Sequence, residues 1–324
     1  MLIKSAVIKF AAFFITVFML IPALSGAPNE KYDVKDPENC RLDFSILSDS
    51  HIEGNNFNRY KVFAGSLKDV KNNKSGNDAV IFLGDNTMNC QHIENMLFHG
   101  AASTILKDEN IISVIGNHDL GNGEGDYNNL LNRWLTYSNA FFNLGIDRQY
   151  YYKVVDGYYF IVLGNECHEI YDMLITDEQY EWLEETLEKA ARSGKPAFVF
   201  SHYPTDDATD ADGNSSDRLT KMLAEYNKEN DIFCFVGHTH MPLYLFWSFH
   251  NYDGFPEIYL PRLTELKGSG DNEIYENSGV GIVAEVYDNE VVIRGRNFYA
   301  GEWRYDTADE AMCEMTYQLK NPIQ

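Results

Sequence analysis

Short apolar runs recur along the chain, and each of them ends in a polar loop. Six such runs, rich in β-branched and aromatic residues, lie at positions 44–47, 79–83, 111–115, 158–163, 197–200 and 232–236. Continuous apolar runs of this length, bounded by turn signals, are typical of buried β-strands. We therefore expect six buried strands between residues 44 and 236.

Helical patterns separate several of these strands. Apolar and small residues fall at helical spacing between positions 90 and 106, which predicts one helix there. A second helix is expected to begin at Thr176-Asp177-Glu178-Gln179, which has the form of a capping box, and to end at Gly194. The alternation of strands and helices favours an α/β fold.

Beyond residue 240 the pattern changes to strands without helices. Four further apolar segments are PLYLFWSF, FPEIYL, GVGIVAEVY and EVVIRGRNF, and Asp288-Asn289 between the last two predicts a hairpin. We therefore expect antiparallel strands in this part. No internal repeat or long linker is apparent, so we predict one domain at 41–305, with a lead at 28–40 and a C-terminal tail at 306–324.

The first 27 residues have the layout of a secretory signal peptide. Two lysines precede an apolar stretch that ends in small residues, and cleavage after Ser25 fits the small-x-small rule. An uncleaved anchor is the alternative, but the stretch is shorter than the roughly 20 residues that a spanning helix needs. We expect a secreted or extracytoplasmic protein, with no membrane insertion after signal cleavage.

Composition narrows the class of protein further. The 324 residues are 44% hydrophobic and 14% aromatic, which is ample for a packed core. The net charge of −23 repels long polyanions, so we expect no stable nucleic-acid binding. The five cysteines show no metal-type spacing, and Cys234 falls inside an apolar run as a small buried residue.

Residues with metal-binding chemistry follow five of the predicted strands. The five segments are Asp49-Ser50-His51, Gly84-Asp85, Gly116-Asn117-His118-Asp119, His202 and Gly237-His238-Thr239-His240. Each alone is weak evidence, because Gly-Asp is a common turn and an Asp-x-His can be a turn with a surface histidine. The Gly-His-x-His segment is stronger, since period-two spacing points both imidazoles the same way. Five such strand ends in one chain indicate a shared site.

This set of side chains suits a dinuclear metal site. Carboxylate, amide and imidazole groups are ligands for manganese, iron or zinc, and no thiolate is present to favour a structural zinc site. Two ions about 3.5 to 4 Å apart need a shared anionic ligand, and they make a bridging water acidic. They also neutralise a phosphoryl group, so an acidic chain can take a small phosphate ester as substrate.

In order and spacing these segments closely resemble the calcineurin-like metallophosphoesterases, from residue 43 to about residue 300. The resemblance implies an α/β (α+β) fold, a four-layer αββα sandwich of two mixed β-sheets flanked by helices. It assigns Asp49, His51 and His240 to one metal and Asn117, His202 and His238 to the other, with Asp85 bridging. His118 would be the catalytic acid beside the metals. The implied reaction is hydrolysis of a phosphate mono- or diester by attack of a metal-bridging hydroxide.

The chain departs from this family at one position. Many members carry a further carboxylate three residues after Gly-Asp, which orients the histidine matched by His118, but here that residue is Met88. Asn86 or Asn89 could provide the contact instead, or a carboxylate elsewhere could. Asp119 could be only a cap for its own turn.

Three functions remain open from the sequence. The first is a secreted metal-dependent phosphoesterase, the second a cyclic-nucleotide or other phosphodiesterase on the same fold, and the third a secreted metal-binding module with little turnover. No substrate-binding residue is assigned. The loops around Asn55-Asn56, at LGNGEGDYNN and around His168 either shape the mouth of the site or are plain surface loops.

Overall fold

The computed structural model describes residues 31–251, 253–268, 273–305 and 311–323. The predicted signal peptide, residues 1–27, lies outside the described residues. Across the described ranges, no helix combines the length and the apolar character needed to cross a membrane.

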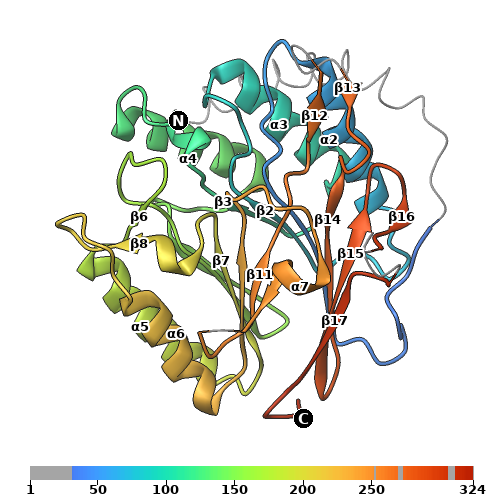
Figure 1. Cartoon of the computed structure of the whole chain (residues 1–324), viewed down its shortest axis with the longest axis vertical. Helices are drawn as coiled ribbons and strands as arrows, with labels where there is room; N and C mark the ends of the chain where they lie inside the picture. Colours follow the sequence, from blue (N-terminus) through green and yellow to red (C-terminus); the bar gives the residue numbers. More distant parts are fainter. Residues whose placement is uncertain (1–30, 252, 269–272, 306–310, 324) are drawn as a thin grey trace.

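The described residues form two large mixed sheets (Figure 1). The first has seven strands: β16 (Glu302–Trp303), β15 (Glu290–Asn297), β14 (Val280–Val286), β1 (Leu42–Leu47), β2 (Ala79–Leu83) and β3 (Ile111–Val114) in that order, with β17 (Glu314–Gln318) also on β15. Strands β1, β2 and β3 are parallel, whereas β14 is antiparallel to both β1 and β15. The predicted hairpin through Asp288-Asn289 is confirmed.

The second sheet has six strands in the order β10 (Phe249–His250), β11 (Glu257–Tyr259), β9 (Ile232–Val236), β7 (Ala197–Ser201), β5 (Tyr158–Val162) and β4 (Tyr151–Val155). Its four central strands, β5, β7, β9 and β11, are parallel to one another. All six strands predicted between residues 44 and 236 are therefore present. Two small ladders pair β6 (Met173–Leu174) with β8 (Ala208–Thr209), and β12 (Leu266–Lys267) with β13 (Glu273–Ile274).

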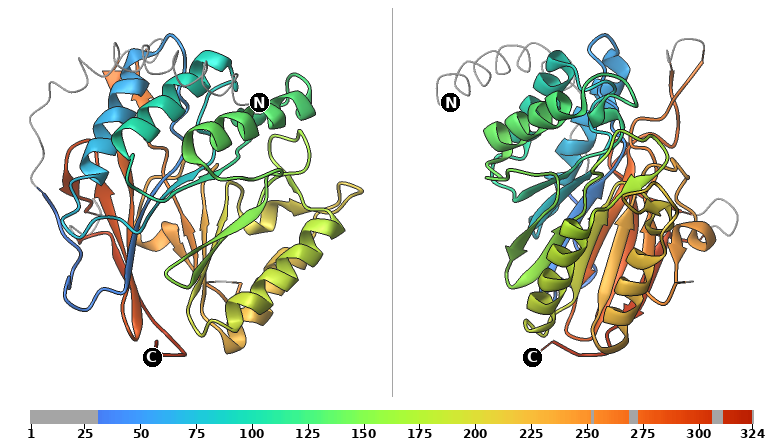
Figure 2. Two further views of the ribbon diagram at one scale, coloured as in Figure 1. Left: turned by 180° about the vertical axis from the view of Figure 1, so that it is seen from behind. Right: turned by 90° about the vertical axis from the view of Figure 1, so that its left-hand side faces the viewer.

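Helices cover the outer faces of the two sheets (Figure 2). On the first sheet lie α2 (Phe57–Val70) and α3 (His92–Ile105), beside α4 (Tyr127–Phe142), and on the second lie α5 (Asp177–Ala191) and α6 (Arg218–Glu229). Two 3₁₀ turns, η1 (His118–Leu120) and η2 (Thr205–Asp207), follow β3 and β7. The order helix, sheet, sheet, helix confirms the predicted four-layer αββα sandwich.

Period-two alternation divides each strand between two cores. In β1, Phe44 and Ile46 point between the sheets, whereas Leu47 packs toward the helices α2 and α3. The Phe44 ring lies 5.1 Å from Phe160 and 4.9 Å from Phe198 of the opposite sheet, centroid to centroid. Strands covered on both faces must be apolar on both faces, which is why the sequence shows continuous apolar runs.

Two predicted local features are wrong, and tertiary contacts explain one of them. The segment 242–249, expected as a strand, contains the short helix α7 (Leu245–Ser248) before β10. The capping box of α5 does not form: the Thr176 hydroxyl donates to Glu166, and the Gln179 amide exchanges hydrogen bonds with the backbone of Gly164. These side chains join α5 to the loop after β5 instead of capping the helix.

The observed sheet extends beyond the predicted domain boundary at residue 305. Strand β17 lies within 306–324, and it pairs with β15 from Glu314 to Gln318. Near the other end, Tyr32 is buried and its ring lies 3.9 Å from the Arg296 guanidinium. Segments predicted as lead and tail therefore pack against the sandwich.

We expect Phe44→Ala to lower the free energy of unfolding by about 3–5 kcal/mol, because it leaves a cavity between the sheets. Chemical denaturation of the two proteins measures this difference. Phe57→Ala is the matched control, since Phe57 is 44% exposed and its loss should change stability by no more than about 0.5 kcal/mol. Equal effects of the two changes would contradict a central role for Phe44.

Candidate metal centre

The polar segments predicted as a shared site meet where the parallel strands of both sheets end. Backbone hydrogen bonds extend the ladders one step beyond the strands, from Asp49 N to the Gly84 carbonyl at 3.1 Å and from Gly237 N to the His202 carbonyl at 3.0 Å. Each loop is thereby held in register with its neighbour. In each of the five loops the first chemistry-bearing side chain lies within three residues of the strand end.

Five of the predicted site residues have left-handed backbone conformations. Their φ angles are 55° at Asp49, 42° at His51, 48° at Asp85, 63° at His238 and 52° at His240. A positive φ is uncommon outside glycine and costs of order 1–3 kcal/mol where the surroundings enforce it. The chain adopts this strained backbone repeatedly at one place, which marks the place as a functional site.

Three glycines precede site residues because neighbouring groups come too close for a side chain. A Cβ at Gly116 would collide with the carboxylate and the backbone nitrogen of Asp85, and a Cβ at Gly237 would collide with the Ser48 hydroxyl. At Gly84 the φ of 89° adds a conformational requirement. Gly116 thus allows two loops of the first sheet to approach closely, whereas Gly84, where a Cβ would collide with His202, and Gly237 allow the loops of the two sheets to do so.

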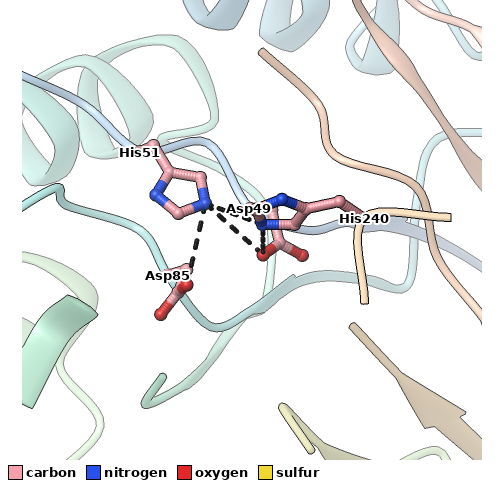
Figure 3. A group of neighbouring side chains, drawn as sticks. All are labelled: Asp49, His51, Asp85 and His240. Carbon is pink, nitrogen blue, oxygen red and sulfur yellow. Dashed lines mark hydrogen bonds and ion pairs between the residues drawn. The ribbon is translucent and has the colours of Figure 1, made fainter. Parts of the chain in front are cut away.

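One group of side chains converges from both sheets (Figure 3). The His240 Nε2 atom lies 3.0 Å from Asp49 Oδ1 and 3.1 Å from His51 Nε2. His51 Nε2 in turn lies 3.5 Å from Asp49 Oδ1 and 3.6 Å from Asp85 Oδ2. Ligand atoms of Asp49, His51, Asp85 and His240 all lie within 4.8 Å of one another, as a single cation requires.

A second group shares the carboxylate of Asp85. Its Oδ1 atom lies 3.3 Å from His202 Nε2, whereas its Oδ2 atom faces the first group. His238 Nδ1 lies 3.0 Å from Asn117 Oδ1. Asp85 thus stands between the two groups, which is the position of a ligand shared by two metals.

The donor atoms fit divalent cations. His202 is fully buried, and its Nδ1–H donates to the Leu83 carbonyl at 2.9 Å, which directs the other ring nitrogen toward Asp85. Among the described residues that Nε2 atom has no hydrogen-bond partner. Ser48 donates to Asp49 Oδ2 at 2.5 Å, so Oδ1 is the oxygen that faces the histidines. Buried, oriented oxygen and nitrogen donors of this kind suit manganese, iron or zinc.

Burial and neighbouring charges shift the pKa values of the site residues. Burial lowers the pKa of His51 to about 3, the neighbouring carboxylates oppose the shift, and the charge of Arg262 adds to it. Burial also opposes ionisation of His202, but the charges of Asp85 and Asp49 outweigh it and raise the His202 pKa to about 9. These interactions with histidines hold the pKa of Asp85 below its usual range despite burial. Interactions with His202, His240 and His51 likewise lower the pKa of Asp49, so two ionised carboxylates share a buried site, which demands positive charge.

His118 is held without a carboxylate at position 88. Its Nδ1–H donates to the Met88 backbone carbonyl at 2.7 Å, and its Nε2 atom lies 4.0 Å from Asp85 Oδ2. The contacts expected of Asn86 or Asn89 are not made: the Asn86 amide donates to Val114 and Asp119, and the Asn89 amide donates to Glu94. Met88 thus provides through its backbone the contact that its side chain cannot provide.

Sequence reasoning missed one cation near the site. Arg262 follows β11, and its charge acts on His51. The adjacent Leu263 N donates to the Ser48 carbonyl at 2.9 Å, which places this segment beside the first metal-binding loop. The signal available in the sequence was that Arg262 follows another apolar run, FPEIYL.

The other histidines whose side chains are described, His92, His99 and His168, lie outside both groups. His168 Nε2 lies 2.8 Å from the Leu120 carbonyl, so it joins the loop after β5 to the turn that contains His118. His92 Nδ1 lies 3.1 Å from the Tyr137 hydroxyl, and His99 is buried against α4.

Fold and site together define a class, the metal-dependent hydrolases that bind ions at the strand ends of an αββα sandwich. The calcineurin-like phosphoesterase family model matches residues 42–242. The chain therefore belongs to the calcineurin-like phosphoesterase family, whose members are metal-dependent phosphoric ester hydrolases with a dinuclear metal centre.

Solved structures share the fold at low sequence identity. A dimetal phosphatase from Danio rerio has a TM-score of 0.57 and 14% identity, over 86% of this chain and 99% of that one. A purple acid phosphatase from yellow lupin (Lupinus luteus) seeds has a TM-score of 0.57 and 16% identity, over 86% of this chain and 53% of that one. No curated protein matches the sequence.

We expect Asp85→Asn to abolish stable binding of both metal ions, because the neutral amide removes the shared negative charge. Metal analysis after gel filtration should find two ions per wild-type chain and close to none in the variant. Asp212→Asn makes the same chemical change on an exposed loop and should leave two ions bound. Loss of just one ion in Asp85→Asn would contradict a shared ligand.

Proposed function

We propose that this chain is an extracytoplasmic enzyme that hydrolyses small phosphate mono- or diesters. The observation that carries the proposal is the placement of His118 beside two groups of candidate ligands. Its imidazole is fixed on one side by the Met88 carbonyl and faces Asp85 on the other. A site that only stored metal ions would not need an oriented histidine that makes no short contact to the ligand carboxylates.

The proposed ligands divide as the two groups do. Asp49, His51 and His240 would hold one ion, Asn117, His202 and His238 would hold the other, and Asp85 would contribute to both. Two bound divalent ions would supply Lewis acidity and an acidic water. Manganese, iron or zinc are the metals that these donors favour.

His118 is positioned to donate a proton. Because a carbonyl can only accept, the hydrogen bond to Met88 places a proton on Nδ1. In the imidazolium form the second proton lies on Nε2, on the side of the ring that faces the metal ligands. The side chain is 19% exposed, so a substrate oxygen can reach it from solvent. His118 would stabilise or protonate the leaving oxygen.

Substrate entry is compatible with an acidic protein. The formal charge of the chain is −23, but a centre that holds two divalent cations attracts an anionic ester locally. His240, with 36% of its side chain exposed, and Arg262, which is half-buried, mark an accessible side of the site. A guanidinium there favours a phosphoryl oxygen over a neutral group.

A purified mature protein loaded with manganese should hydrolyse 4-nitrophenyl phosphate, bis(4-nitrophenyl) phosphate or both. Removal of the metal with a chelator should abolish turnover, and added manganese should restore it. Parallel assays with monoesters and with diesters, including 3′,5′-cyclic nucleotides, distinguish a phosphatase from a phosphodiesterase. Two bound ions without turnover of any ester would overturn the proposal in favour of a metal-binding module.

We expect His118→Ala to lower kcat by about 10²- to 10⁴-fold for esters with poor leaving groups, since it removes the acid. The loss should be smallest for 4-nitrophenyl esters, whose leaving group needs little protonation. Metal content should stay near two ions per chain. Equal losses for all leaving groups, or loss of metal, would show that His118 has a different role.

Export is the remaining part of the proposal, and the apolar segment at residues 10–24 supports it. Expression of the full chain in a secreting host should give a processed protein outside the cytoplasm, with cleavage after Ser25 read by N-terminal sequencing. Retention of Met1 in a membrane fraction would show an anchor instead.

A further inference from the structure

We infer that Asp119 is a positioning residue that holds the loop after β2 in place, so that the Met88 carbonyl can orient His118. This inference rests on the proposed role of His118 as the proton donor. It assigns a task to a buried carboxylate whose five hydrogen-bond donors are groups other than the candidate ligand atoms.

The carboxylate of Asp119 accepts hydrogen bonds from five donors. Oδ1 accepts from Thr87 N at 2.9 Å and from Thr87 Oγ1 at 2.9 Å. Oδ2 accepts from Asn86 N at 3.1 Å, from Asn86 Nδ2 at 3.3 Å and from Gly116 N at 3.2 Å. Four of the five donors belong to the loop after β2, so the main effect of Asp119 is on a different segment from its own.

These bonds fix the peptide that orients His118. Thr87, which bonds to Asp119 through both its backbone and its side chain, directly precedes Met88. The Thr87 hydroxyl also accepts from Cys90 N at 3.2 Å, and Met88 N donates to the Ile52 carbonyl at 3.0 Å. Hydrogen bonds of Thr87 before Met88 and of Cys90 after it therefore hold the Met88 carbonyl in place. This carbonyl accepts a hydrogen bond from His118 Nδ1.

The arrangement links His118 to Asp119 through two residues of another loop. Asp119 directly follows His118 in sequence, yet the route from one side chain to the other passes through Thr87 and Met88. All five hydrogen-bond partners of this buried carboxylate are donors. An amide in its place would direct its NH₂ group, also a donor, at some of them. Loss of the charge should therefore release the loop and let the His118 ring rotate.

A role confined to capping the turn at 116–120 predicts something different. It would lower stability and metal content, and any effect on turnover would be the same for every substrate. Positioning of His118 predicts a loss of kcat that grows as the leaving group becomes poorer, with little change in KM. It also predicts no further loss once His118 itself is absent.

The test compares Asp119→Asn, Thr87→Val and Thr87→Ser, each with His118 and with His118→Ala. Thr87→Val removes the hydroxyl that bonds to Asp119 and accepts from Cys90, whereas Thr87→Ser keeps it as a matched control. We measure kcat and KM for phosphate esters with leaving groups of increasing basicity, together with metal content and melting temperature.

We expect Asp119→Asn to lower kcat by about 10- to 100-fold for poor leaving groups, the size of effect that a small misplacement causes. Thr87→Val should change kcat in the same direction by a smaller factor, and Thr87→Ser should match the wild type. In the His118→Ala background none of the three changes should lower kcat further. Full additivity in that background, or loss of metal together with uniform loss of rate, would overturn the inference.

A second readout does not depend on turnover. In the zinc-loaded protein, NMR should show a slowly exchanging, hydrogen-bonded Nδ1–H proton of His118, assigned by its absence in His118→Ala. We expect Asp119→Asn and Thr87→Val to broaden or remove this signal and Thr87→Ser to keep it. An unchanged signal in Asp119→Asn would overturn the inference, whereas a wild-type enzyme inactive on every ester would overturn only the proposed function.

Discussion

The carboxylate of Asp85 is the group on which the rest of the site depends. It is fully buried, and removing an ionised carboxylate from water costs several kcal/mol unless other groups compensate. Compensation comes from three neighbouring loops: His51 after β1, the backbone N–H of His118 after β3, and His202 after β7. Because one small group needs partners from both sheets, the two sheets must end at the same place.

Bringing the loops of both sheets together at one place requires strained backbone conformations. Five site residues take positive φ angles, and three glycines are retained where a Cβ would collide with a neighbouring loop. Strain of this kind persists only where the surrounding structure enforces it. Here the enforcement comes from the phenylalanine-rich core between the sheets, which fixes the strands whose ends carry the loops. The packing of the core therefore fixes the geometry of the site.

The contacts of His118 show how a loop can fix an imidazole with no side-chain carboxylate at position 88. A side-chain carboxylate at position 88 would have oriented the imidazole directly. In this protein a backbone carbonyl does so, and a carboxylate one residue from the histidine steadies the loop that carries the carbonyl. The support therefore consists of several bonds in series, each of which can be varied separately.

The sequence alone determined the positions of the six strands between residues 44 and 236 and the order of the site residues, because strands buried on both faces must be apolar and the loops after them carry the chemistry. It determined the αββα fold only through a family resemblance. Tertiary structure decided what local pattern could not: that Thr176 and Gln179 bond to a neighbouring loop instead of capping a helix, that β17 joins the first sheet, and that the carbonyl of Met88 orients His118. A backbone carbonyl is present at every residue, so no sequence pattern can show which one will accept a particular hydrogen bond until the fold brings the two groups together.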